Sequence, residues 1–232
     1  MKAFLPTLCV AVAMVAAFPA TGGATNECKG ITACIVVPGP WVLVVPGHES
    51  EYLLSCPKGQ GIVAGLDAQA TSLNVRVSFD GQLGAPVSPG VTTSRSTLFH
   101  ALTLGKRQQA FQPLLGCVPA AGGGGRSTVS ARTAVPRPTT TGLPLDPHAQ
   151  TVVVRPGLVR TASVRCPVGE QLAGTWDALA FRTTNPPDLA QAANIEVHRT
   201  VVQGKAVVTV LATDALSPDA RAVVQVGVEC AP

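Results

Sequence analysis

The sequence has few charged and few aromatic residues. Charged residues make up 13% of the 232 residues, about half of the roughly 25% typical of globular domains, and aromatic residues make up 4%. The formal net charge is only +4 and the basic residues are scattered, which argues against a nucleic-acid-binding face. A hydrophobic content of 46% without a Gly-X-Y or heptad period excludes a disordered polyelectrolyte, a collagen and a coiled coil.

Long apolar runs are also scarce, and the one that occurs lies at the N-terminus. Lys2 supplies a positive charge, residues 3–18 are apolar apart from two positions, and small residues at 22–24 fit a signal-peptidase site. A membrane anchor is the alternative, but the run is shorter than the roughly 20 apolar residues that a span needs. The pattern therefore predicts a signal peptide over residues 1–24 and a secreted, extracellular or periplasmic protein with no membrane span.

The chain has seven cysteines, one of which, Cys9, lies inside the predicted leader. Six cysteines in an exported chain predict a disulfide framework, because thiols pair and stay paired in an oxidising compartment. By themselves six cysteines allow 15 connectivities. The six are Cys28, Cys34, Cys56, Cys117, Cys166 and Cys230.

An internal repeat relates the two halves of the sequence at an offset of 110 residues. Residues 42–47 match residues 152–157 at four of six positions, and the same offset aligns Cys56 with Cys166. Self-similarity over about 80 residues predicts duplication of one domain. The expected organisation is a first domain over 25–119, a linker over 120–147 and a second domain over 148–232.

The repeat also selects among the disulfide connectivities. A second cysteine follows the first by 61 residues in one half and by 64 in the other. Symmetric pairing favours one long-range bridge in each half and a small local loop near the N-terminus, while the symmetric alternative joins the halves. The favoured pairs are Cys56–Cys117, Cys166–Cys230 and Cys28–Cys34, and the alternative pairs are Cys56–Cys166 and Cys117–Cys230.

The segment between the halves is rich in Gly, Pro, Ser and Thr. It contains Gly122–Gly125 and scattered arginines, with hardly an apolar pair, so it cannot bury a core and predicts a flexible, solvated spacer. Two sharper interpretations are a stalk that spans a cell wall and an O-glycosylated segment at residues 138–141.

Runs of strand length rich in Val and Thr predict an all-β fold. In the first half, residues 73–79 alternate and end at Asp80-Gly81, a hairpin signal. No segment shows a sustained helical period, so any helices are expected to be short. In the second half the expected strands are Thr151–Val154, Val159–Cys166, Gln171–Phe181, Asn194–Thr200, Lys205–Ala212 and Arg221–Cys230. This spacing predicts two tandem disulfide-pinned β-sandwiches.

The order Cys166, Trp176, Cys230 resembles the Cys…Trp…Cys core of immunoglobulin domains. The resemblance implies a bridge that joins two sheets, with the tryptophan packed on it. Val228 stands where that family has a tyrosine, and Leu66 occupies the place of Trp176 in the first half. We therefore expect an Ig-like, disulfide-pinned sandwich outside the immunoglobulin family itself.

Candidate catalytic and metal-binding motifs are weak. The four histidines show no i+2 or i+4 pairing for zinc, and no Gly-x-Ser-x-Gly motif is present. Ser55-x-x-Lys58 matches a motif of penicillin-interacting enzymes, but the companion motifs are absent and a proline interrupts it. Asp67 and Asp177 occupy equivalent places in the two halves and are expected to accept backbone N–H bonds. The sequence thus predicts no catalytic, cofactor-binding or metal-binding residues.

Two functions of different classes remain. The preferred prediction is a non-catalytic structural or binding module of the cell envelope or extracellular space, with a protein or polysaccharide partner and no nucleic acid. The alternative is a secreted hydrolase with a site at a domain cleft or interface. A monomer is expected, with residues 35–41 as an extra edge strand, although the same apolar segment could be donated to a neighbouring molecule.

Overall fold

The fold is all-β in the computed structural model, which describes residues 34–58, 61–80, 95–119 and 145–232. The predicted signal peptide, most of the predicted linker, Cys28 and the Gly122–Gly125 run lie outside these ranges. No helix in the described part of the chain is long and apolar enough to cross a bilayer. The strands of the first half are β1 (Ile35–Pro38), β2 (Trp41–Val44), β3 (Ser50–Ser55), β4 (Ile62–Ala70), β5 (Val75–Asp80), β6 (Ser96–Thr103) and β7 (Gln109–Val118).

The second half follows the predicted strand pattern closely. β10 and β12 have the bounds expected from the sequence, whereas β8 begins at Asp146, two residues inside the predicted linker. Two short 3-10 helices complete this half. Its elements are β8 (Asp146–Val153), β9 (Val159–Arg165), β10 (Gln171–Phe181), η1 (Leu189–Asn194), β11 (Ile195–Val202), β12 (Lys205–Ala212), η2 (Pro218–Ala220) and β13 (Ala222–Ala231).

The strands pair in the same pattern in both halves. In the first half β7 lies between β4 and β2, and β3, β6 and β5 form a separate sheet. In the second half β13 lies between β10 and β8, and β9, β12 and β11 form the separate sheet. Even the irregularities correspond, because a register shift precedes Gly65 in β4 and Gly174 in β10.

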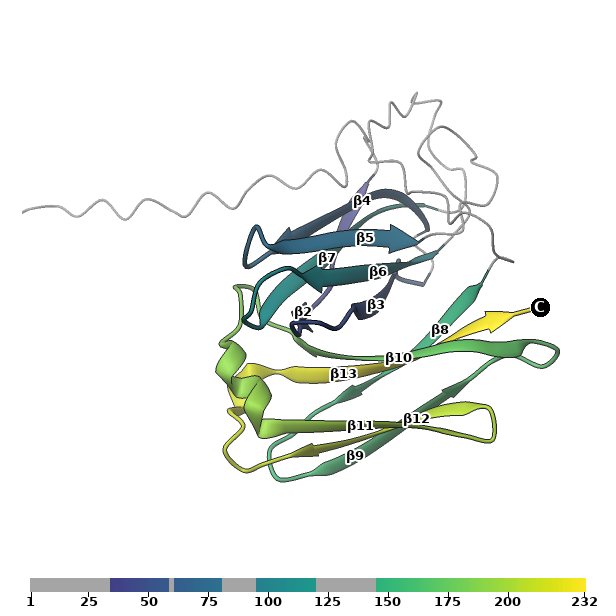
Figure 1. Ribbon diagram of the computed structural model, residues 1–232. Helices are drawn as coiled ribbons and strands as arrows, with labels where there is room; N and C mark the ends of the chain where they lie inside the picture. The colour runs from purple at the N-terminus through teal and green to yellow at the C-terminus, as the bar shows by residue number, and fades with distance from the viewer. Residues whose placement is uncertain (1–33, 59–60, 81–94, 120–144) are drawn as a thin grey trace, which may run out of the picture.

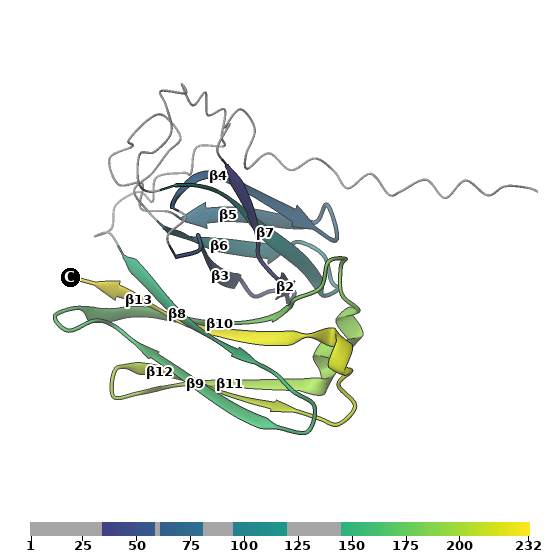
Figure 2. The same ribbon diagram turned by 180° about the vertical axis from the view of Figure 1, so that it is seen from behind.

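A seven-stranded sheet runs through both halves. β2 pairs with β7 along one edge and with β10 along the other, where Val42 opposes Ala180 and Trp41 opposes Phe181. β1 pairs with β7 of the same chain, along the edge of β7 that also pairs with β2. Figures 1 and 2 show the two halves stacked, with β2 and β3 next to β10. The sequence alone had left open whether the halves touch.

The two hydrophobic cores are each completed by residues of the other half. The first core, around Phe99, Phe111 and Leu115, includes Ala178, Ala180 and Val223 of the second half. The second core is built mainly from alternate residues of β12 and β13, and it includes Leu43 of β2. Val-rich alternation thus fills both cores, and neither half buries its apolar residues alone.

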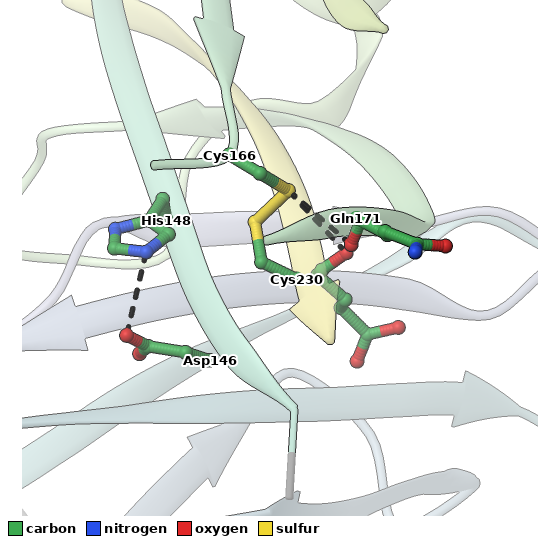
Figure 3. Close-up of a disulfide and its surroundings, with 6 residues drawn as sticks. Asp146, His148, Cys166, Gln171 and Cys230 are labelled. Atoms are coloured by element: carbon green, nitrogen blue, oxygen red, sulfur yellow. Dashed lines mark hydrogen bonds and ion pairs between the residues drawn. A yellow bond between two sulfur atoms is a disulfide. The ribbon is translucent and has the colours of Figure 1, made fainter. Parts of the chain in front are cut away.

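The two long-range disulfides are confirmed. Cys56 pairs with Cys117 and Cys166 with Cys230, at Cα–Cα distances of 5.8 and 5.5 Å, so the alternative pairs between the halves are wrong. Each bridge joins the residue after β3 or β9 to the strand β7 or β13 of the facing sheet, as Figure 3 shows for Cys166 and Cys230. Cys34 is also disulfide-bonded.

Two local expectations differ from the structure. Trp176 does not pack on the Cys166–Cys230 bridge, because it shares the face of β10 with Ala178, which belongs to the other core. Its ring covers Gly227 of β13, where any Cβ would overlap it. Leu73 is fully exposed in a turn before β5, and β6 starts only at Ser96, so the connection after Asp80 is longer than a tight hairpin turn.

Candidate functional site

The histidines, which the hydrolase alternative would need, lie on different elements of the fold. His198 Nε2 is 2.8 Å from Glu196 Oε1 on β11, and the His198 side chain is 65% exposed. His148 Nε2 lies 3.4 Å from Asp146 on β8, as Figure 3 shows. His48 lies in the turn after β2. These histidines are dispersed over two strands and a turn.

Two side-chain groups within the described ranges bring potential metal-ligand atoms within 4.8 Å of one another. One contains His148, Glu170 and Cys230, but the Cys230 sulfur is bonded to Cys166 and offers no thiolate. The other contains Glu49, Glu51 and His100, where His100 Nδ1 is 3.6 Å from an oxygen of each glutamate. The sequence could not reveal this second group, because β3 and β6 come together only through strand pairing.

The repeat-equivalent aspartates have different partners. Asp67 Oδ1 accepts the N–H of Ala68 at 2.7 Å, as expected. Asp177 Oδ1 instead lies 2.9 Å from Arg199 Nε and so ties β10 to β11 of the facing sheet. Burial raises the pKa of Asp177 above its ordinary value, and the neighbouring Arg199 guanidinium partly offsets this rise.

A buried amide fixes the junction between the halves. Gln225 of β13 is only 4% exposed, and its side chain makes two hydrogen bonds to the backbone of Leu53 in β3. Leu53 N–H donates to Gln225 Oε1 at 2.7 Å, and Gln225 Nε2 donates to the Leu53 carbonyl at 3.0 Å. We call this pair of bonds the Gln225 clamp. It satisfies both polar ends of the amide in a place that water does not reach.

Tyr52, the neighbour of Leu53, adds a second polar contact across the junction. Its side chain forms a hydrogen bond with the side chain of Thr151 in β8. Burial raises the pKa of Tyr52, while the charge of Arg182 and the bond to Thr151 lower it by less. Together with the Gln225 clamp, this contact places β3 across β13 and β8 in one orientation.

Three arginines converge where strands of the second half end. Arg155 follows β8, Arg182 follows β10 and Arg221 precedes β13. Because these neighbouring strands are antiparallel, the three arginines lie at the same end of the strands. They surround a depression of about 630 Å³, which we call the arginine groove. Its other lining residues are Val153, Val154, Pro156, Leu158, Pro218 and Val223.

The backbone holds Arg221 in an unusual conformation. Its φ and ψ of 47° and 43° place it in the left-handed region, which side-chain-bearing residues adopt rarely. The Arg182 N–H donates to the Arg221 carbonyl at 3.1 Å, which links the two strand ends. Ser217 caps the turn before Arg221 by accepting the Asp219 N–H at 3.3 Å. These contacts set the direction in which the Arg221 side chain leaves the sheet.

The three arginines are exposed and form no ion pair with any carboxylate of the described residues. Asp188 and Asp219 line an adjoining depression, to which Arg182 and Arg221 also contribute. The Asp188 carboxylate accepts the N–H of Ala190, whereas Asp219 donates its own backbone N–H to Ser217 Oγ. The groove therefore combines an aliphatic floor with three arginines that form no ion pair, while the carboxylates of Asp188, Asp214 and Asp219 lie outside its lining. Such a surface attracts an anionic ligand that also carries apolar groups.

Sequence reasoning missed both the Gln225 clamp and the arginine groove. Gln225 occupies an outward position in an alternating strand, and the arginines are separated by more than 25 residues in the chain. Arginine content carried no signal because it is spread over the whole sequence. One usable signal existed, since Arg155 replaces Val45 within the most similar stretch of the repeat.

Comparisons with known proteins returned no family model, no curated protein and no solved structure that matches the chain.

Proposed function

We propose that the protein is an exported, non-catalytic binding module of the cell envelope or extracellular space, in which two tandem Ig-like β-sandwiches act as one rigid body. The predicted leader at residues 1–24 and the disulfide framework support export. In this proposal the domains span 25–119 and 148–232 with a linker over 120–147, as the sequence predicts, although β8 already begins at Asp146. The observation that carries the proposal is the Gln225 clamp.

The clamp supports a binding role because it builds a composite surface. A depression of about 690 Å³ at the junction is lined by Gly39 and Tyr52 of the first half and by Arg182 and Thr183 of the second. A passive spacer gains nothing from fixing its two halves, whereas a surface made from both halves keeps its shape only if their orientation is fixed.

Retention by isolated envelope fractions tests the proposal. The exported protein, with its disulfides intact, is incubated with separated protein and polysaccharide fractions of the producing organism's envelope. We expect saturable retention by one fraction, and no retention of the same protein after reduction and unfolding. Lack of retention by both fractions would contradict a binding role. Hydrolysis of ester or glycoside substrates that a His198→Ala change abolishes would favour the hydrolase instead.

A further inference from the structure

The repeat shows what the arginine groove corresponds to in the first half. At the offset of 110 residues, Leu43 and Val45 of the first half align with Val153 and Arg155 of the second. Leu43 is 8% exposed and belongs to the second core, and Val45 packs against that core. In the first half this surface is therefore covered by another β-structure, namely the second half of the chain.

In the second half the equivalent surface is open. Val153 is 51% exposed and Leu158 is 43% exposed, although both lie on the apolar floor of the arginine groove. Within the described residues, β8 pairs only with β13, so the sheet ends beside the groove. The surface that receives a protein chain in one copy of the repeat is thus left accessible in the other.

The chemistry of the groove limits what can occupy it. Three arginines without carboxylate partners favour an occupant that carries carboxylates, and each Arg–carboxylate pair forms strong, directional hydrogen bonds. None of the nine described lining residues is aromatic, so the groove has no flat ring on which a sugar stacks. Its floor of valine, leucine and proline instead complements aliphatic side chains.

The chain itself does not supply such an occupant. The segments outside the described ranges, namely residues 1–33, 59–60, 81–94 and 120–144, contain a single carboxylate side chain, that of Glu27. The segment 120–144 carries three arginines and no acidic residue, so the groove repels it. Charge complementarity therefore points to a different chain.

We infer that the arginine groove is the docking site for an extended, acidic segment of a partner protein, in which carboxylates alternate with aliphatic side chains. The carboxylates pair with Arg155, Arg182 and Arg221, and the aliphatic side chains lie on Val153 and Leu158. This inference rests on the proposed binding function and assigns that function a site and a class of partner.

Fluorescence anisotropy with three labelled probes of equal charge tests the inference. The probes are the peptide (Glu-Val)5, the peptide (Glu-Ser)5, which lacks the aliphatic groups, and pentagalacturonate, an acidic sugar with five carboxylates. Both peptides are amidated at the C-terminus and labelled at the N-terminus, so that each probe carries five negative charges before the label. We expect (Glu-Val)5 to bind on the order of tenfold more tightly than the other two, because only it satisfies both the charge and the floor of the groove. Equal affinity for all three probes would overturn the assignment to a peptide.

Charge-reversal variants locate the site. Arg155→Glu combined with Arg182→Glu is expected to weaken (Glu-Val)5 binding by tenfold or more, in the range that loss of charge-assisted hydrogen bonds produces. The matched control, Arg76→Glu combined with Arg165→Glu, changes the net charge equally at exposed arginines of β5 and β9 and should leave the affinity within about twofold. Equal losses in both double variants would show binding by net charge and overturn the site.

A second pair of variants isolates the apolar floor. Leu158→Ser should weaken (Glu-Val)5 binding without changing (Glu-Ser)5 binding, whereas Leu211→Ser, at a leucine of similar exposure on β12, should change neither. The Arg155→Glu/Arg182→Glu protein is also tested for envelope retention. If it is retained on the same envelope fraction as the unmodified protein, the groove is not the docking site, but the proposed binding function still holds. Peptide binding without any envelope retention would reject the binding function instead.

Discussion

Tyr52 is the only tyrosine in the chain, so a tyrosine titration of the protein measures the ionisation of this junction residue alone. Burial raises its pKa above the ordinary 10.0, so its ionisation in the folded protein should have a midpoint above pH 10.0. A spectrophotometric titration of tyrosinate measures this midpoint directly. In denaturant the midpoint should return to about 10.

The raised pKa of Tyr52 has a consequence for stability. The folded state holds the Tyr52 proton more tightly than the unfolded state, so stability falls as pH rises from the unfolded pKa through the folded one. At neutral pH, Tyr52→Phe should lower the free energy of unfolding by about 0.5–1.5 kcal/mol, because the bond to Thr151 is lost. As the pH rises above 10.0, the free energy of unfolding should fall less in the variant than in the unmodified protein. An alkaline stability profile identical in both proteins would show that Tyr52 ionises as freely in the folded state as in the unfolded one.

The indole ring of Trp176 lies directly on Gly227 and leaves no space for a side chain there. A Cβ at this position would overlap the Trp176 side chain, which is 4% exposed and cannot move outward without losing its burial. We expect Gly227→Ala to reduce the free energy of unfolding by about 1–3 kcal/mol, as overpacking does in other cores. Urea denaturation measures the loss.

Two further variants distinguish a steric cause from a general effect of alanine on glycine sites. Gly105→Ala places its Cβ in ordinary van der Waals contact and should change the free energy of unfolding by less than about 0.5 kcal/mol. Trp176→Leu should recover part of the loss when it is combined with Gly227→Ala. If the double variant were as unstable as the sum of the two single variants, the ring would not be the cause.

The two disulfides act on equivalent elements. Each closes a loop of just over 60 residues and joins the strand pair β3–β7 or β9–β13 across a core. In the chain-entropy model, removing either bridge by Cys→Ser changes costs about 4 kcal/mol. We expect the variants Cys56→Ser/Cys117→Ser and Cys166→Ser/Cys230→Ser to lose similar amounts in chemical denaturation. Losses that differ by more than about twofold would show that the repeat is not energetically symmetric.

At the scale of elements, local sequence determines strands whose two ends carry turn signals. β10 lies between Pro-Val-Gly and Asn-Pro-Pro, and β12 begins after Gln-Gly, so both were predicted with their observed bounds. β5 was predicted to start too early because Leu73 fits the alternation, yet it is an exposed turn residue. Strand existence therefore follows from the pattern, whereas a strand end without a turn signal is decided by pairing.

At the scale of the whole molecule, residues that depend on long-range contact escape sequence reasoning. In the stretch Val224-Gln225-Val226, glutamine reads as a solvent-facing residue of an amphipathic strand. It is buried only because β3 of the first half covers it. The disulfides could be predicted because a repeat preserves cysteine positions. The clamp could not, because it joins a strand of one half to a strand of the other, and no pattern within either half indicates that contact.

The shared sheet and the completed cores make unfolding of the two halves a coupled process. Separating them would expose Ala178, Ala180 and Leu43 and leave the polar atoms of the Gln225 clamp to find other partners. We therefore expect a single calorimetric transition, with equal calorimetric and van't Hoff enthalpies, and equal protection of slow amides in β6 and β12 during hydrogen exchange.

Gln225→Met tests this coupling because it keeps the size of the side chain and removes both bonds to Leu53. The unpaired Leu53 backbone groups should lower the free energy of unfolding by about 1–3 kcal/mol and broaden or split the transition. Gln171→Met, at an exposed glutamine of β10, should do neither. Two transitions in the unmodified protein would contradict a rigid junction, because halves that melt independently gain no stability from the sheet they share.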